Sequence, residues 1–242
     1  KGNPIRWIKG SAKKGLHRAN WDLKLSPPDP INLTQPAFKP PWAGDAEGPL
    51  VAPGTYSVAF FVVHNGLLKA QGAPQTFTVK RVPNVTPNAD FNAIAAFQEK
   101  TSELSRQISS AGRKLGEAGN RLRYMKAAIL ETPKAIPKLF ADLNQLQQNL
   151  AELQKRLYGD PIRQRLNENS SPSISSRVGN VAYGHWQTTQ NPTETHKRNI
   201  EIAETDFSKF RGDLATYFNA LEKYEATLEA VGAPYTPGRK FD

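Results

Sequence analysis

Residues 94–129 read IAAFQEKTSELSRQISSAGRKLGEAGNRLRYMKAAI. Apolar or small residues recur in this stretch at alternating steps of three and four, from Ile94 and Phe97 to Met125 and Ile129. That spacing places them along one side of an α-helix for about five heptads. The stretch therefore predicts a helix over 88–131, about 60 Å long, which needs other helices beside it to cover its apolar seam.

Two further segments, 136–157 and 200–231, repeat the same spacing of apolar residues. The stretch ETPKAIP (131–137) separates the first two seams, because proline is tolerated in the first turn of a helix but breaks its interior. A shorter helix is expected over 172–186. Together these segments predict an antiparallel four-helix bundle over residues 86–242, with the helices running up, down, up and down.

The first 85 residues follow a different pattern, rich in Pro and Gly with short β-branched and aromatic runs. TYSVAFFVV (55–63) and QTFTVKRV (75–82) are typical of strands, and Asn65-Gly66 is a turn favoured in two-residue hairpins. The prolines of 27–53 predict a long surface loop. We expect a β-sandwich over residues 1–85, so that the whole chain is an α+β multidomain protein.

Composition narrows the function classes. The 242 residues include no cysteine, which excludes disulfides, thiolate metal sites and a cysteine nucleophile. No run of 18 apolar residues predicts a membrane span, and the four histidines have no metal-ligand spacing. The motifs of phosphate-binding loops, dinucleotide folds and serine hydrolases are missing too. The sequence thus predicts no catalytic residue, no metal and no cofactor.

Paired carboxylates are another candidate for a catalytic site, because glycoside hydrolysis needs two of them a short distance apart in a cleft. The acids of the first 85 residues are Asp22, Asp29, Asp45 and Glu47. Asp22 follows Trp21 in a predicted strand, so the pleat turns it away from the core that Trp21 enters. We interpret Trp21 as structural. A hydrolase that combines acids of both halves remains the alternative.

The formal net charge is +10, and much of the excess lies early in the chain. Lys13, Lys14 and Arg18 indicate a contact with an anionic glycan or surface, or the protection of exposed strand edges by cations. No nucleic-acid-binding motif accompanies them, so nucleic acid is not an expected partner.

One stretch of the later half is unusual: SSRVGNVAYGHWQ (175–187) combines two glycines with an aromatic cluster. Tyr183, His185 and Trp186 either pack tightly on the other helices or form a contact surface for a partner. We favour packing, since glycine allows another backbone to approach closely.

Five stretches together resemble a known family: GLHRANWDLK (15–24), GPLVAPGTYSVAFFV (48–62), QTFTVKRVPNV (75–85), GDPIRQRLNENSSPSISSRVGNV (159–181) and LEAVGAPYTPGR (228–239). They are similar to the Ig-like β-sandwich and helical region that follow the β-propeller in secreted bacterial proteins of the sortilin-like, or neuraminidase-repeat, type. Such proteins are often labelled glycosyl hydrolases. Any catalysis that the resemblance implies belongs to the propeller, so no catalytic residue carries over.

The resemblance implies roles for particular residues. Trp21 would fill the core of the sandwich, Pro53, Gly54 and Tyr56 would form the turn into its central hairpin, and Phe60 would be a further anchor. The family's first strand precedes NPIRWI, so that strand is missing here. A segment of the upstream propeller or of a neighbouring subunit is expected to pair with PIRWIK (4–9).

The function expected from the resemblance is that of a non-catalytic accessory module. It would dock or space a β-propeller in a secreted or cell-surface protein of the bacterial envelope.

Overall fold

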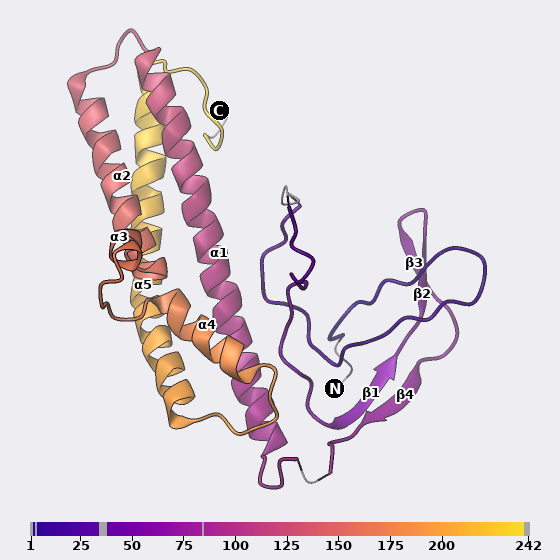
Figure 1. Cartoon of the computed structure of the whole chain (residues 1–242). Coiled ribbons are helices and arrows are strands. Elements are labelled where there is room, and N and C mark those ends of the chain that lie inside the picture. Colours follow the sequence, from indigo (N-terminus) through magenta and orange to yellow (C-terminus); the bar gives the residue numbers. More distant parts are fainter. Residues whose placement is uncertain (1, 3, 34–37, 84, 240–242) are drawn as a thin grey trace.

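The computed structural model describes residues 2, 4–33, 38–83 and 85–239. Within these residues the chain is α+β, with five helices and two small antiparallel sheets that occupy separate parts of the molecule (Figure 1). In chain order the elements are β1 (Gly54–Val58), β2 (Phe61–His64), β3 (Leu67–Ala70), β4 (Gln75–Val79), α1 (Phe91–Leu130), α2 (Pro137–Tyr158), α3 (Pro161–Arg165), α4 (Ile174–His185) and α5 (Glu194–Ala230).

The four strands of residues 54–79 form one long, interrupted hairpin, which we call the ribbon. Its first arm contains β1 and β2, and its second arm contains β3 and β4. β1 pairs with β4 and β2 pairs with β3, all antiparallel. Asn65 and Gly66 close the tip with φ angles of 50° and 76°. These positive angles confirm the predicted hairpin turn, because Asn and Gly are the residues that tolerate them at low cost.

The ribbon is interrupted where a single strand had been predicted over 55–63. Val58 pairs with Gln75 and Phe61 pairs with Ala70, so residues 59–60 of the first arm oppose residues 71–74 of the second arm. Pro74 has no backbone N–H to donate, and Gly72 has a φ of +75°. The unequal count breaks the ladder as a bulge does, which divides the predicted strand into β1 and β2.

Trp21 packs on the ribbon as an anchor. Its ring lies 5.6 Å from the ring of Tyr56 and 6.0 Å from that of Phe77, and its Nε1–H donates to the carbonyl of Lys24 over 2.9 Å. Both rings belong to the β1–β4 sheet, where Tyr56 and Phe77 are cross-strand partners. Trp21 is therefore half-buried against one sheet, whereas Phe60, which had been expected as an anchor, is 65% exposed.

The strand predicted through Trp21 and Asp22 is wrong. Leu23 has a φ of 59°, which an extended strand cannot contain, and only an isolated bridge joins Lys24 to Leu50. Asp22 is nevertheless directed outward. Its carboxylate accepts from Arg6 at 2.7 and 3.0 Å and from the N–H of Lys24 at 3.1 Å, so it holds two neighbouring segments together.

Residues 4–9, the PIRWIK segment, form no strand within the described chain. The hydroxyl of Ser26 donates to the carbonyl of Ile5 over 3.1 Å, and the ring of Trp7 lies 5.8 Å from that of Phe61. The segment thus lies along the ribbon without joining its ladder. Pairing of this segment with a partner remains a prediction.

The helices begin where their first N–H groups are capped or absent. The carboxylate of Asp90 accepts from the N–H groups of Asn92 and Ala93 at the start of α1. Pro137 occupies the first turn of α2, where its missing N–H is not needed. The spans predicted for α1, α2, α4 and α5 agree with the structure to within a few residues. The short α3 was missed in a segment that had been interpreted as polar loop.

The helices enclose one apolar core (Figure 1). α1 packs against α2 and α4, and α5 packs against α2 and α4. Figure 1 shows that α1 and α5 run in the same direction and that α2 and α4 both run opposite to them. The predicted order of up, down, up and down is therefore wrong, because the two shorter helices follow one another along the two long ones. The predicted seam of α1 is buried along its length, with Leu115, Leu122, Met125 and Ile129 almost fully enclosed. Each such side chain contributes roughly 1.5–3 kcal/mol relative to an exposed position. The seams thus provide a core that is complete within the described residues.

Two buried tyrosines in this core differ in one hydrogen bond. The hydroxyl of Tyr224 donates to the carbonyl of Leu139 over 2.9 Å, whereas the buried hydroxyl of Tyr217 has no partner in the described chain. Burial raises the pKa of both phenols to about 12. Both hydroxyls therefore stay protonated near neutral pH, and only that of Tyr217 remains unsatisfied.

We predict opposite effects on stability when these two hydroxyls are removed. Tyr217→Phe raises the free energy of unfolding by about 1 kcal/mol, because it removes a buried polar group without breaking a bond. Tyr224→Phe lowers it by about 1 kcal/mol, because it leaves the carbonyl of Leu139 unpaired. Urea unfolding followed by circular dichroism measures both. Equal losses in the two variants would show that the Tyr217 hydroxyl is bonded after all.

Candidate functional site

Apolar burial is distributed very unevenly between the two halves. The buried aliphatic and aromatic side chains run from Ile94 to Ala233, and of the described residues before Ile94 only Pro28, Gly48 and Pro49 are buried. Nineteen of the 28 exposed large hydrophobic residues in the described chain lie before residue 86. A soluble protein rarely leaves so much apolar surface in one region unless that region is an interaction site. The ribbon and its surroundings are therefore the candidate site.

One face of the β2–β3 hairpin is wholly apolar. Val63 and Leu68 are cross-strand partners, as are Phe61 and Ala70, and the pleat directs all four side chains to the same face. Phe61, Val63 and Leu68 are 37%, 66% and 55% exposed, and Trp7 covers part of Phe61. This face, which we call the open face, offers a surface for a second layer of structure.

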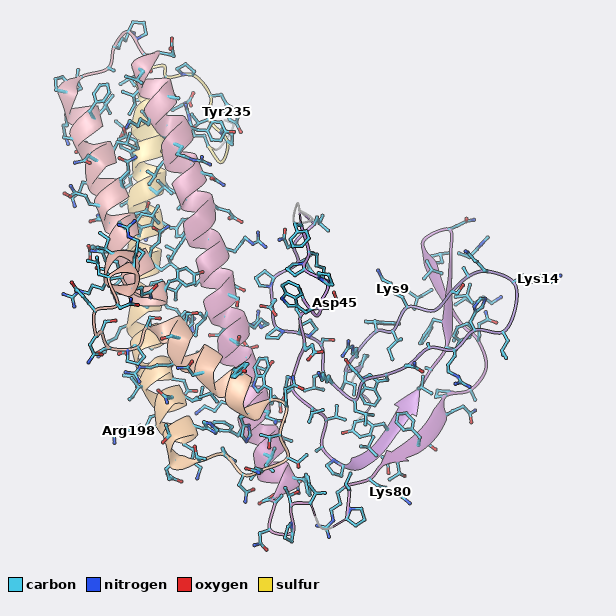
Figure 2. All side chains as sticks on the ribbon, in the orientation of Figure 1. Lys9, Lys14, Asp45, Lys80, Arg198 and Tyr235 are labelled. Carbon is cyan, nitrogen blue, oxygen red and sulfur yellow. The ribbon has the colours of Figure 1, made fainter. Side chains whose placement is uncertain are left out.

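Cations surround the ribbon in excess of acids. Asp22, Asp45 and Glu47 are each engaged by a cation of the same half, namely Arg6, Lys39 and Lys24 respectively. Figure 2 labels three further cations of this half, Lys9, Lys14 and Lys80. The exposed cations of the described early half that have no carboxylate within ion-pair distance are Lys9, Lys13, Lys14, Arg18, Lys69, Lys80 and Arg81.

Lys13, Lys14 and Arg18, the predicted anionic contact, lie together in an exposed segment without regular structure. The ring of His17 donates to the carbonyl of Lys13 over 2.7 Å, which folds this segment back on itself. The three cations are thus grouped by a local turn and face solvent. Their arrangement is compatible with an anionic ligand, although no buried polar group defines a pocket for one.

The aromatic cluster at the end of α4 divides into buried and exposed members. His185 and Trp186 are 1% and 7% exposed, whereas Tyr183 is 92% exposed. His185 and Trp186 therefore pack in the interior. Their burial means that the alternative role of a partner contact does not hold for these two residues. Tyr183 alone of the three is available at the surface.

Trp186 belongs to the joint between the two halves, which we define as residues 50–52 against residues 186–189. The N–H of Leu50 donates to the carbonyl of Trp186 over 3.1 Å. Nearby, the side-chain amide of Gln187 donates to the carboxylate of Glu47 over 3.3 Å. The segment leading into β1 is thus fastened to the loop that follows α4.

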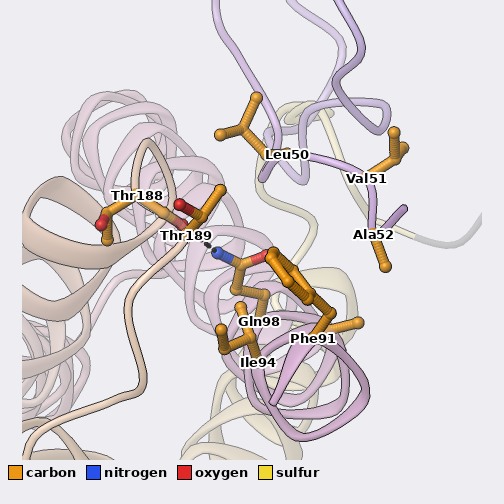
Figure 3. Close-up of a pocket in the computed structure, with 9 residues that line it drawn as sticks. Leu50, Val51, Ala52, Phe91, Ile94, Gln98, Thr188 and Thr189 are labelled. Atoms are coloured by element: carbon orange, nitrogen blue, oxygen red, sulfur yellow. Dashed lines mark hydrogen bonds between the residues drawn. The ribbon is translucent and has the colours of Figure 1, made fainter. Parts of the chain in front are cut away.

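A small cavity of about 10 Å³ lies inside the joint (Figure 3). It is lined by Leu50, Val51, Phe91, Gln98 and Thr188, among others, and the amide of Gln98 donates to the carbonyls of His185 and Thr188. The volume suits one water molecule and no larger ligand. The joint is therefore a structural connection. This connection was not predicted from the sequence.

A shallow groove of about 220 Å³ between α1 and α5 contains two carboxylates, Glu103 and Glu204. Glu204 pairs with Lys100 at 2.8 Å. Hydrogen bonds from Arg106 and Gln107 lower the pKa of Glu103 to about 2. A glycosidase acid requires a raised pKa, so Glu103 is ionised where such an acid must be protonated. Both acids come from helices, and the alternative that combines acids of the two halves gains no support from this groove.

The described residues contain neither a group of metal ligands nor a helix that could span a membrane. In the described part of the chain, no three His, Asp or Glu side chains are grouped as metal ligands would be. None of the described helices combines the length and the apolar character needed to cross a bilayer.

Comparisons with known proteins leave the chain without a match among family models, curated proteins and solved structures. The resemblance to the region behind a bacterial β-propeller accordingly depends on the quoted residues alone.

His185 makes the helical half sensitive to acid. Its Nε2–H donates to the carbonyl of Gln190 over 3.0 Å, its buried Nδ1 has no partner in the described chain, and the ring of His196 lies 5.5 Å away. Burial lowers the pKa of His185 below the ordinary 6.5, and the nearby His196 adds to this shift. The unfolded chain therefore takes up this proton at a higher pH than the folded chain.

We predict that the free energy of unfolding falls as the pH is lowered through 6.5 toward the depressed pKa of His185. Above pH 6.5 this residue makes no pH-dependent contribution. His185→Gln removes its share of the slope, whereas His17→Gln, a change at an exposed ring, serves as the control and keeps it. Urea unfolding between pH 5 and pH 8 gives the slopes. An unchanged slope in His185→Gln would contradict the assignment.

Proposed function

We propose that the chain is a non-catalytic docking module whose ribbon is completed by another β-rich unit. The observation that carries this proposal is that, apart from two prolines, no apolar side chain is buried among the described residues before Ile94, next to a complete helical core. A two-stranded hairpin is marginally stable in water by itself. A partner that covers the open face supplies the missing second layer.

The resemblance gives this proposal its particulars. The completed β half, residues 1–85, forms an Ig-like sandwich, and the helices of residues 86–242 form the support that follows it. The covering unit is the β-propeller of the same polypeptide or a neighbouring subunit, in a secreted or cell-surface protein. Hydrogen bonds at the joint, such as that from Leu50 to Trp186, hold the ribbon on the helices and support a role in spacing and positioning.

We predict that a photoreactive amino acid replacing Leu67, which is 74% exposed at the tip of the ribbon, cross-links to a β-strand-rich segment in the producing cell. The same probe at Tyr124, 54% exposed on α1, is the control and yields no such product. Mass spectrometry locates the cross-linked peptide. Cross-links from Tyr124 alone, or none from Leu67, would remove the docking proposal.

A second candidate function is recognition of an anionic glycan by the exposed cluster of Lys13, Lys14 and Arg18, favoured by the lack of carboxylate partners around it. Exposed ion pairs are screened by salt, so such binding weakens as ionic strength rises.

We predict that a triple change to alanine at Lys13, Lys14 and Arg18 abolishes salt-sensitive retention on an immobilised sulfated glycan. A matched triple change at exposed positions of the later half, outside the β strands, keeps retention; the three positions are Lys126, Lys134 and Lys223. Elution at increasing salt compares the two variants. Equal losses would assign the retention to overall net charge and count against a defined glycan surface.

A further inference from the structure

We propose that the outer edge of β3 and β4 accepts an acidic, extended segment of a partner protein as an added strand. This inference rests on the docking function proposed above and specifies the chemistry of the partner. Three observations carry it: the free backbone of this edge, the cations along it and the apolar side chains beside it.

The backbone of this edge is unpaired. β3 pairs only with β2 and β4 pairs only with β1, so each of them has an outer side facing no other strand. Within the described residues, no hydrogen bond joins that outer side to another segment. Rows of free N–H and C=O groups are a template for an incoming strand, which gains affinity from main-chain bonds.

Charge distinguishes the two edges of the ribbon. Lys69 lies in β3, and Lys80 and Arg81 directly follow β4, all three exposed and without a carboxylate partner in the described chain. The opposite edge, formed by β1 and β2, reads GTYSV and FVVH and contains no Lys, Arg, Asp or Glu. Electrostatic complementarity therefore favours an acidic segment at the β3–β4 edge.

The same cations disfavour a second copy of this chain as the occupant. Two β3–β4 edges paired with one another would bring Lys69, Lys80 and Arg81 of one copy close to the same cations of the other. Like charges in neighbouring strands are destabilising, and strand-edge lysines are a known means of preventing self-pairing. An acidic strand meets no such repulsion, so the cations select a partner of opposite charge as well as protecting the edge.

Apolar side chains define the rest of the partner's pattern. Leu67 and Leu68 in β3 are 74% and 55% exposed, and Phe77 in β4 is 38% exposed. Successive residues of a strand alternate between faces, so Leu68 lies on the open face whereas Leu67 and Lys69 lie on the other face. An added strand that places its apolar residues beside Leu68 therefore places the intervening acidic residues on the face of Lys69. The expected partner segment thus alternates apolar and acidic residues over the length of β4.

The test uses the full chain and two synthetic peptides of about eight residues, one alternating Val with Glu and the other Val with Lys. Amide shifts in ¹H–¹⁵N NMR spectra locate binding. The Val-Glu peptide is expected to shift amides of residues 67–81, and the Val-Lys peptide is expected to leave them unchanged. Equal binding of both peptides, no binding of either, or shifts confined to the helices would overturn the proposal.

A charge-reversed variant provides the specificity control. Lys69→Glu with Lys80→Glu and Arg81→Glu is expected to weaken binding of the Val-Glu peptide by about tenfold and to permit binding of the Val-Lys peptide. A matched triple reversal at exposed positions of the later half is expected to change neither affinity; the three positions are Lys126, Lys134 and Lys223. Circular dichroism confirms that each variant is folded. An unchanged preference after charge reversal would overturn the role of these cations.

Three outcomes separate this inference from the proposals made above. Cross-links from Leu67 to a segment without acidic residues would sustain docking and reject the acidic strand. If a sulfated oligosaccharide shifts the amide signals of Lys69 and Lys80 and the Val-Glu peptide shifts none, the result would reject the added strand and favour a glycan ligand. Binding of the Val-Glu peptide without any cellular cross-link from Leu67 would support the edge chemistry and reject docking.

Discussion

A two-stranded ribbon cannot enclose its own apolar side chains, and this constraint determines how the rest of the molecule can work. Among the described residues, Trp7 and Trp21 of the N-terminal segment are the aromatic side chains outside the ribbon that contact its rings. The open face therefore remains exposed, although its residues are of the kind that normally form a core. Completion by another unit is the physical condition for a compact β half.

The helical half shows the contrast within the same chain. Its seams meet around one core, and polar groups in that core have specific partners, such as Tyr224 with the carbonyl of Leu139 and Arg121 with Glu225. The C-terminal segment closes over it, with the buried guanidinium of Arg239 donating to the carbonyl of Pro234 and pairing with Glu229. The helical half thus holds the uncovered ribbon at the joint. This arrangement is suited to presenting the ribbon to a partner.

The sequence predicted the helices well because their signal is local and repeated. Heptad spacing from Ile94 to Ile129 specifies a helix whichever helices lie beside it, and Pro137 marks the next start. The strands were less predictable. The division of 55–63 depends on the residues that oppose it, and the irregular path at Leu23 depends on a single positive φ. Neither feature has a periodic signature.

The candidate site shows the same difference. Trp21 and Tyr56 were each predicted to be structural, although their contact with one another was not, and the cations Lys13, Lys14 and Arg18 were visible in the sequence. The joint at Leu50 and Trp186 could not be anticipated, because it joins segments that are remote in the chain through backbone atoms. The burial of His185 likewise depends on how α4 lies against α1 and α5, which spacing alone does not specify.

Amide hydrogen exchange on the chain without any partner tests the central claim most directly, because it reports the stability of each half separately. The account predicts that amides of β1–β4 exchange at rates close to those of an unfolded chain, while amides around Leu122 and Met125 in α1 are strongly protected. Protection of the ribbon amides equal to that of α1 would contradict it, since the β half would then be stable without a partner.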